Sequence, residues 1–478
     1  MLRERPKAVT PQGLSTDACD GGGLSRSSVE VPVMGMEQRG QLIYVICVEQ
    51  LIFFFRMNQE QINKPFSIPK QLVYDAWKGV KENRGSSGID TVSIKDYEES
   101  LEKNLYKLWN RMSSGVYFPK PVKLVEIPKK TGGKRPLGIP AVEDRVAQTV
   151  VVLKISERLD MEFHKDSYAY RPGRNAIEAV TTARERCWKY DWVLDMDIRK
   201  FFDTINHELL MLAVKRHVTE KWILLYIERW LKVPYETLSG ERIERMMGVP
   251  QGSVIGPVLA NLFMHYVFDK WMQIYYPDIP FERYADDTIC HCRTQPEAEN
   301  MKVVIMKRLA DCGLELNEEK TRIVYCKDSK RKENQENVSF DFLGFTFRPR
   351  RSKSKQGKVF TGFNPGISQK SKNHIHSTLR SWQLWRMKNL MEVDTQMIAP
   401  VRGWINYYGK FNRSRLISTL QSLNFAIVRW AVRRYKRFKG SLKRGWMWLM
   451  RMYAKNPKAF FHWGRGIIPC YYEAKSVR

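Results

Sequence analysis

The segment FERYADDTICHC, from Phe281 to Cys292, places two adjacent aspartates between two short hydrophobic runs. Asp286 and Asp287 are neighbours in the chain, and their like charges repel each other unless something nearby compensates them. The flanking runs are typical of β-strands, and a tight turn between them predicts a hairpin. The segment therefore predicts a hairpin that carries paired carboxylates at its tip.

A second predicted strand, upstream of the hairpin, supplies further carboxylates. In VLDMDIRKFF, from Val193 to Phe202, Asp195 and Asp197 are two residues apart and so point to the same face of a strand. Asp197 lies nearer the end of the strand, where its carboxylate can reach the hairpin tip, and Asp195 is the alternative. The tripeptide ADD alone is also compatible with an ordinary aspartate-rich turn. Its place between strand-like flanks, downstream of a strand that ends in Asp, favours a functional cluster.

Carboxylates gathered in this way suit divalent cations. Mg²⁺ prefers oxygen ligands and is usually held by one or two carboxylates together with phosphate oxygens. Two such ions, about 4 Å apart, can activate an attacking hydroxyl and stabilise the leaving oxygen of a phosphoryl transfer. The sequence therefore predicts a two-metal Mg²⁺ site formed by Asp197, Asp286 and Asp287.

The rest of the pattern predicts an α+β body with an antiparallel sheet, followed by a mainly helical region. In residues 122–140, apolar and polar residues alternate on both sides of Gly132 and Gly133, which predicts a β-hairpin. The segment GVPQGSVIGPVLANLF opens at a Pro/Gly turn and continues as a helix with a buried stripe. Helices are also predicted over 142–158 and 296–314, and strand pairs at TRIVYC and FDFLGFTF. After Gly344 the pattern becomes mainly helical and basic.

Charge is distributed unevenly along the 478 residues, whose formal net charge is +29. From Gly344 to Arg478 there are 29 Lys or Arg and three acids, whereas the preceding residues hold 51 basic and 48 acidic side chains. This cationic region also contains seven of the 14 Trp, which a disordered basic arm would lack. The combination predicts a folded domain that binds nucleic acid.

The first 56 residues do not fit the pattern of the body. LIYVICVEQLIFFF, from Leu42 to Phe55, is too short to span a bilayer and lies too far from the start to be a signal peptide. We expect residues 1–56 to be a dispensable leader, and we expect no membrane partner. The eight cysteines form no C-x-x-C pair, so neither a zinc site nor a disulfide framework is predicted, and a reducing cytoplasm is the expected location.

The order of these blocks resembles that of the reverse transcriptases encoded by group II introns. RYADD resembles their Y-x-D-D motif, and NRGSSGID resembles their extra N-terminal block. IPKKTGGKRPLGIPAVEDRVAQ, SYAYRPGRNAIEAV, DMDIRKFFDTINHELL and GVPQGSVIGPVLANLF resemble the blocks that follow, and LELNEEKTRIVYC and FDFLGFTF resemble the last two. RGWINYYGKF falls where the family has its thumb, or maturase, domain. The resemblance implies a right-hand polymerase fold, with fingers and palm over residues 57–345 and a mainly α-helical thumb/maturase domain over residues 346–478.

The resemblance also implies roles for individual residues. Asp197, Asp286 and Asp287 would bind the catalytic Mg²⁺ ions. The family's nucleotide-binding positions correspond to Lys129, Arg135, Phe202, Gln251 and Lys320. Of these, Lys129 and Arg135 would hold the triphosphate and Gln251 would pack near the incoming nucleotide. Phe202 would exclude the ribose 2′-hydroxyl, with core packing beside Phe201 as the alternative. Lys320 would protonate departing pyrophosphate, with pairing to Glu318 and Glu319 as the alternative.

The implied function is an RNA-directed DNA polymerase that also binds its host group II intron RNA, promotes splicing, and supports mobility by target-primed reverse transcription. Its partners would be the intron RNA, an RNA template with a DNA primer, dNTPs and target DNA. It would act in a bacterial-type cytoplasm, on the nucleoid when bound to DNA. Two alternatives stay open: a splicing maturase without polymerase activity, and a related reverse transcriptase recruited to another role.

The basic region would contact RNA phosphates. We expect its RNA-binding face within RRYKRFKGSLKR, at Arg433, Arg434, Lys436, Arg437 and Lys439. Trp404, Tyr407 and Tyr408 have a helical spacing that also suits the core of the thumb itself. No Cys-pair or H-N-H nuclease pattern follows FHWGRG, which leaves second-strand cleavage without a visible nuclease domain, and priming from nascent strands at a replication fork is the alternative.

Overall fold

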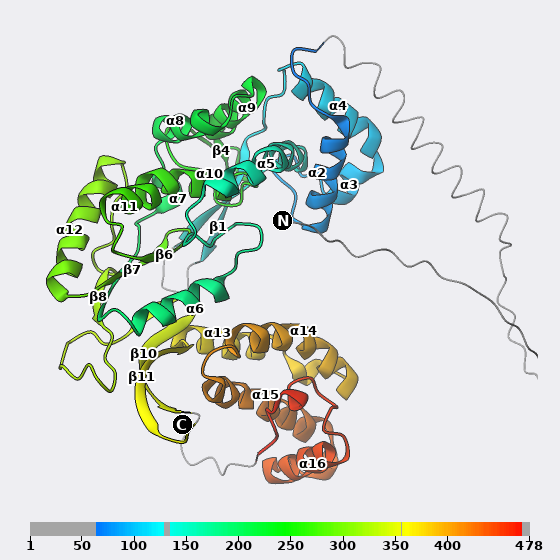
Figure 1. Cartoon of the computed structure of the whole chain (residues 1–478). Helices are drawn as coiled ribbons and strands as arrows, with labels where there is room; N and C mark the ends of the chain where they lie inside the picture. The colour runs from blue at the N-terminus through cyan, green and yellow to red at the C-terminus, as the bar shows by residue number, and fades with distance from the viewer. Residues whose placement is uncertain (1–63, 129–133, 355, 471–478) are drawn as a thin grey trace, which may run out of the picture. The chain divides into compact units, whose positions relative to one another are not determined.

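The computed structural model describes residues 64–128, 134–354 and 356–470, and Figure 1 shows the order of their helices and strands. The expected leader over residues 1–56 lies outside the described residues. Within the described ranges, no helix combines the length and the apolar character that crossing a membrane requires. The structure is α+β with largely antiparallel sheets and a helical C-terminal region, which confirms the predicted fold class.

The palm sheet is four-stranded and antiparallel. Its strands lie in the order β6 (Phe281–Tyr284), β7 (Asp287–Cys292), β3 (Trp192–Met196) and β8 (Arg322–Tyr325). The register of β3 against β7 places Met196 opposite Thr288. Val193 and Leu194 in β3 are fully buried, as expected for a central strand whose two faces are covered. The predicted carboxylate hairpin and the predicted upstream strand are therefore neighbours in one sheet.

The fingers hairpin, formed by β1 and β2, belongs to a second four-stranded sheet. Its strands lie in the order β2 (Lys134–Ile139), β1 (Val122–Pro128), β4 (Tyr235–Glu236) and β5 (Arg242–Ile243). The β1–β2 pairing is antiparallel, as predicted, whereas β1 pairs with β4 in parallel. The predicted turn at Gly132 and Gly133 lies outside the described residues. The helices next to this sheet in sequence are α2 (Lys70–Glu82), α3 (Ile94–Glu99), α4 (Leu101–Ser113) and α5 (Val142–Glu162).

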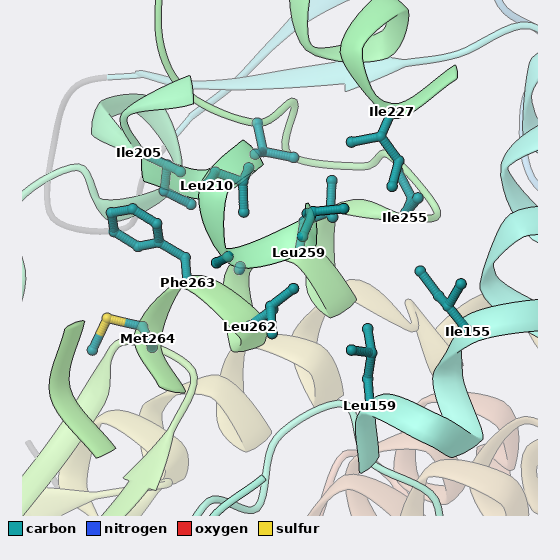
Figure 2. Packing of buried hydrophobic residues seen from close by; sticks show 14 of the residues in the cluster. Ile155, Leu159, Ile205, Leu210, Ile227, Ile255, Leu259, Leu262, Phe263 and Met264 are labelled. Atoms are coloured by element: carbon teal, nitrogen blue, oxygen red, sulfur yellow. The ribbon is translucent and has the colours of Figure 1, made fainter. Parts of the chain in front are cut away.

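Helices surround the palm sheet (Figure 1). They are α6 (Ala176–Cys187), α7 (Phe201–Thr204), α8 (His207–His217), α9 (Lys221–Lys232), α10 (Gly256–Met264), a π-helix η2 (His265–Asp269), α11 (Lys270–Tyr275) and α12 (Gln295–Asp311). α6 packs in a smaller core with the palm strands and the strands within residues 340–367, whereas all the other helices share one large apolar core with the fingers helices. Figure 2 shows part of this core, where Leu259 and Leu262 of α10 lie near Ile155 and Leu159 of α5. The buried stripe predicted for α10 is thus the surface that joins the palm to the fingers.

The start of α10 depends on a glutamine in α5. The side-chain oxygen of Gln148 accepts hydrogen bonds from the Val254 amide at 2.8 Å, the Ser253 hydroxyl at 3.2 Å and the Ile255 amide at 3.4 Å. Amides at a helix start have no partner within the helix, so a buried oxygen that accepts from them stabilises the turn. Gln148 therefore fixes the helix that follows the PQG turn.

The region after Gly344 begins with strands, which differs from the expectation of helix. β9 (Phe340–Phe342), β10 (Phe345–Lys353) and β11 (Val359–Ile367) form an antiparallel sheet in the order β11, β10, β9. The boundary expected between residues 345 and 346 falls inside β10. Phe345, Phe347 and Phe363 are fully buried, whereas the outer part of β10 carries Arg and Lys. These basic residues conceal the alternation that would have indicated strands.

The thumb helices are α13 (Gln369–Ser381), η3 (Leu384–Arg386), α14 (Leu390–Tyr408), α15 (Arg413–Arg434), η4 (Lys436–Phe438), α16 (Leu442–Lys455) and η5 (Trp463–Arg465). They form a separate apolar core. Trp404 stacks on Trp382, with ring centroids 5.7 Å apart, and the Tyr407 hydroxyl donates to the Leu343 carbonyl oxygen at 2.8 Å. The aromatic residues of RGWINYYGKF are therefore used in packing within the protein.

Candidate active site and nucleic-acid surfaces

The tip of the carboxylate hairpin is a two-residue turn. Tyr284 pairs with Asp287, which leaves Ala285 and Asp286 to form the connection between β6 and β7. Ala285 has a φ of 60°, in the left-handed region that residues other than glycine rarely adopt. The turn therefore presents its two aspartates through a strained backbone conformation that the surrounding structure has to maintain.

Arg283 supports this turn from inside the protein. Its buried guanidinium forms a forked ion pair with Asp269, at 2.7 Å to Oδ1 and 2.6 Å to Oδ2. The remaining N–H groups donate to the side-chain oxygen of Asn261 at 3.2 Å, to the Ser167 hydroxyl at 2.8 Å and to the Ala285 carbonyl oxygen at 3.2 Å. All five donors of the guanidinium thus have an acceptor. The bond to the Ala285 carbonyl connects this buried network directly to the strained turn.

The register of the palm sheet brings a third carboxylate to the hairpin. Asp197 follows Met196, and Asp287 precedes Thr288, the residue that Met196 faces. Because β3 and β7 are antiparallel, the backbones of Asp197 and Asp287 lie opposite each other at the end of this pair. The predicted convergence of Asp197, Asp286 and Asp287 at one end of the palm sheet is therefore seen in the structure.

These carboxylates affect one another electrostatically. Burial, and then the charges of Asp286 and Asp197, raise the pKa of Asp287 to about 6. Burial also raises the pKa of Asp286, and the charge of Asp197 adds to the effect. Lys320 acts in the opposite direction on both groups, and Lys370 at the start of α13 does so on Asp287. A concentration of negative charge in a partly dehydrated place is a feature of functional sites.

The donor set fits a divalent cation, because a bound cation would relieve the repulsion that raises these pKa values and carboxylate oxygens are the ligands that Mg²⁺ prefers. In the described part of the chain, however, no group of three or more His, Cys, Asp or Glu side chains is arranged to hold a metal ion as the side chains stand. Lys320 partly accounts for this, since its Nζ lies 2.7 Å from Oδ2 of Asp197. A lysine cation therefore compensates one of the three carboxylates. Lys320 does not pair with Glu318 or Glu319, which was the alternative interpretation.

Asp195 lies deeper in the palm sheet. Burial, and then the charges of Asp287 and Asp341, raise the pKa of Asp195 to about 8. In β3 it faces Ile289 on one side and Arg322 on the other. Asp195 is thus a half-buried neighbour of the carboxylate cluster, two residues further from the end of the sheet than Asp197.

Three of the expected nucleotide-binding residues are brought together at the PQG turn. Nε of Arg135, in the fingers hairpin, donates to Oε1 of Gln251, and Nε2 of Gln251 donates to Oδ1 of Asp203 at 3.4 Å. Phe202 precedes Asp203 in α7, and its carbonyl oxygen accepts from the amide of Val249 at 2.7 Å. Arg135 also lies close enough to Asp286 to lower the pKa of that carboxyl. Lys129 lies outside the described residues.

Phe202 is half-buried. Its ring packs edge-on against Phe201, with centroids 5.2 Å apart, and contacts the large apolar core. Gly248 fixes the neighbouring backbone: its φ is 83°, and a Cβ there would lie 2.7 Å from the carbonyl oxygen of Asp203. Phe202 therefore has a packing role and retains a partly exposed ring.

Two domain families match the chain. Residues 127–347 match the reverse transcriptase (RNA-dependent DNA polymerase) family, and residues 368–448 match the group II intron, maturase-specific domain. The chain belongs to the group II intron reverse transcriptase and maturase family.

Among curated relatives, Protein YkfC of Escherichia coli is 28% identical, over 63% of this chain and 84% of its own length. The group II intron-encoded protein LtrA of Lactococcus lactis is 27% identical, over 58% of this chain and 45% of its own length. The chain thus spans most of YkfC but less than half of LtrA. Among solved structures, telomerase from Candida albicans matches over 77% of this chain and 70% of its own, with 13% identity and a TM-score of 0.41.

In this member of the group II intron family, the basic run at 433–444 does not form one continuous surface element. Arg433 and Arg434 end α15, Lys436 and Arg437 lie in η4, and Lys439 follows with a φ of 48°. All five side chains are exposed. The Nε of Arg434 donates to the Lys388 carbonyl oxygen at 3.1 Å, and the guanidinium of Arg437 lies over the rings of Tyr435 and Phe438. The five expected RNA-binding residues are therefore exposed but are distributed over the end of a helix and the turn after it.

Proposed function

We propose that the chain is an RNA-directed DNA polymerase that also binds a group II intron RNA, promotes its splicing and supports mobility by target-primed reverse transcription. The observation that carries the polymerase proposal is the meeting of Asp197 with Asp286 and Asp287 at one end of the palm sheet, where the charge of Asp197 helps to raise the pKa of both hairpin aspartates. A splicing maturase without polymerase activity would not need this charge concentration, because the clustered carboxylates contribute nothing to RNA binding.

The three aspartates would hold Mg²⁺. When bound, Mg²⁺ would activate the attacking primer hydroxyl and stabilise the leaving oxygen. Lys320 would release Asp197 at that stage and could donate its proton to pyrophosphate, since an ammonium 2.7 Å from that carboxylate already lies beside the reacting groups.

The residues around the PQG turn would bind the incoming dNTP. Arg135 would hold phosphate oxygens through its forked guanidinium, and its present bond to Gln251 shows that it lies beside that turn. The exposed part of Phe202 would fill the space next to the sugar 2′ carbon and so disfavour ribonucleotides. Lys129, outside the described residues, would extend the same cationic surface.

The thumb would bind the intron RNA. Its core is apolar and its surface carries the cationic excess of the chain, which is the charge distribution expected for a protein that neutralises RNA phosphates. The maturase-specific match over 368–448 lies within this region. The template-primer duplex and target DNA are further polyanions that this surface would accept. The proposed location is the bacterial-type cytoplasm, where the intron transcript and the nucleoid are found.

Primer extension on an RNA template with Mg²⁺ tests the polymerase proposal. Asp286→Asn and Asp287→Asn should each reduce extension to background, because an amide lacks the charge that a metal ligand needs. Asp278→Asn, the same change at an exposed loop aspartate, is the matched control and should extend at the wild-type rate. Near wild-type extension by Asp286→Asn would show that the metal assignment is incorrect, provided that thermal unfolding is unchanged.

A further inference from the structure

A groove on the thumb shares Arg433 with the basic run at 433–444 but otherwise is formed by other residues. It runs between α13, η3 and α15, has a volume of about 830 Å³, and is lined by Arg380, Trp385, Phe425, Arg429 and Arg433, among others. This volume lies within the range typical of small-molecule sites. Of the predicted RNA-binding residues, Arg433 lies in the groove, whereas Lys436 and Arg437 are in η4.

Two aromatic rings in the groove are exposed to solvent. Trp385 is 56% exposed and Phe425 is 41% exposed, although both belong to a folded helical domain. Trp430 and Trp446 also line the groove but are buried, and Trp430 donates its Nε1–H to the Met387 carbonyl oxygen at 3.1 Å. Buried aromatic side chains thus form the floor of the groove, and Trp385 and Phe425 remain exposed along it. Exposed, clustered aromatic side chains mark an interaction surface.

The charges in the groove specify the partner. Guanidinium groups of Arg380, Arg429 and Arg433 line it together with His376, and no acidic side chain is found among its described lining residues. The guanidinium of Arg429 lies 5.8 Å from the ring centroid of Phe425. Flat aromatic rings that alternate with guanidinium groups suit a ligand whose flat bases alternate with phosphates. A lipid tail or an apolar peptide would bury against the aliphatic residues that also line the groove, but it would leave the three arginines without an anionic partner.

We propose that this groove binds unpaired nucleotides of RNA, with bases stacked on Trp385 and Phe425 and phosphates held by the three arginines. The proposal rests on the proposed RNA-binding function of the thumb and specifies which part of the RNA enters the groove. Base-paired nucleotides cannot enter, because their faces are already stacked within the helix.

Filter binding of the full chain to three RNA hairpins tests the proposal. One hairpin carries an unpaired run, the second carries the same run with abasic sugars, and the third is fully paired. Trp385→Ala and Phe425→Ala should each weaken binding of the first hairpin by roughly 5- to 150-fold, which is the loss of one stacked base. They should leave binding of the abasic and paired hairpins within about twofold. The slope of log affinity against log salt should stay unchanged, since no cation is removed.

Two comparator variants make the result specific. Tyr275→Ala removes an exposed aromatic ring from the palm and should bind all three hairpins like the wild type. The triple change Lys436→Ala, Arg437→Ala and Lys439→Ala removes cations outside the groove. It should weaken all three hairpins alike and flatten the salt slope by roughly 0.7 to 0.9 for each lost phosphate contact.

The outcomes separate the groove from the general function. If the wild-type chain binds RNA with a steep salt slope but does not distinguish bases from abasic sugars, or if Trp385→Ala and Phe425→Ala both bind like the wild type, the groove proposal is overturned. Unchanged RNA affinity together with an altered oligomeric state in Trp385→Ala, measured by sedimentation, would assign the groove to a second copy of the chain and also overturn it. If the wild-type chain binds none of the hairpins, the proposed RNA-binding function itself fails.

Discussion

At the scale of single residues, Arg283 is the side chain whose loss should be felt most strongly. Arg283→Met would leave the buried carboxylate of Asp269 without its cation, and we expect the free energy of unfolding to fall by about 3 to 5 kcal/mol. Arg199→Met, which removes the exposed pair with Glu315, should cost about 1 kcal/mol or less. Urea unfolding at neutral pH measures both. Equal effects of the two changes would show that the buried network contributes no special stability.

Phe202 should control the choice of sugar. Replacing it by Ala should increase incorporation of ribonucleotides relative to deoxyribonucleotides, because the half-buried ring would no longer fill the space next to the sugar 2′ carbon. Competition between the two substrates in a primer-extension assay gives the ratio. Phe201→Ala is the matched control, since its ring is buried and should affect stability instead. An unchanged ratio in Phe202→Ala would leave that ring with core packing alone.

The positions of the three aspartates could be predicted from the sequence, whereas the buried hydrogen bonds of Arg283 and Gln148, which stabilise the surrounding turns, could not. Asp286 and Asp287 are adjacent, and Asp197 ends a recognisable strand, so local pattern was sufficient. The partners of Arg283 come from distant parts of the chain, a loop, the end of α10 and η2. Gln148 likewise contacts residues more than one hundred positions away. A single sequence gives no signal for contacts of this kind, which arise only when the elements pack.

At the scale of secondary-structure elements, the start of α5 is sensitive to pH. Asp144 accepts from the Tyr117 hydroxyl at 2.5 Å and from the Lys120 amide at 3.1 Å, and burial raises its pKa to about 7. The folded protein therefore binds this proton more tightly than the unfolded chain, in which the pKa is near 4. The contribution of Asp144 to the free energy of unfolding is thus full below pH 4 and is lost as the pH rises to about 7.

Asp144→Asn tests this pH dependence. The wild-type free energy of unfolding should fall between pH 4 and pH 7 more steeply than that of the variant, by up to about 1.4 kcal/mol for each pH unit. Asp278→Asn, at an exposed position, should follow the wild-type curve. Denaturation at a series of pH values provides the comparison. Parallel curves for the wild type and Asp144→Asn would mean that this carboxyl is ionised throughout the range.

Helices and strands were predictable where the spacing of apolar residues followed a single period. The fingers hairpin alternates on both sides of a glycine turn, and α10 has a continuous buried stripe, so both were predicted correctly in type and place. The start of β10 was predicted within FDFLGFTF, but its extension and its pairing with β11 were missed because the exposed face is crowded with Arg and Lys and both strands contain Pro. The Arg and Lys residues on this face thus obscured the local signal for strands.

At the scale of the whole molecule, the proposed polymerisation and the proposed RNA binding would use different parts of the chain. The carboxylates belong to the palm sheet, whereas the maturase-specific match and the cationic excess belong to the region after Gly344. We therefore expect Asp286→Asn to promote splicing of the host intron at low Mg²⁺ as well as the wild type does, although it cannot extend a primer. A splicing time course measures this. Loss of both activities in a correctly folded Asp286→Asn protein would show that the two functions share one site.

At Ala285, the residue that would make the turn most stable differs from the residue that holds the two aspartates in place. The left-handed backbone there would suit glycine, and Ala285→Gly should release roughly 1 kcal/mol of steric strain. The same exchange would let the turn sample many conformations, so the two aspartates would spend less time at one spacing. Selection for heat resistance and selection for activity should consequently favour different residues at this position. A thermostabilising screen that ignores polymerisation is therefore expected to recover glycine here, in a protein that melts later and copies more slowly.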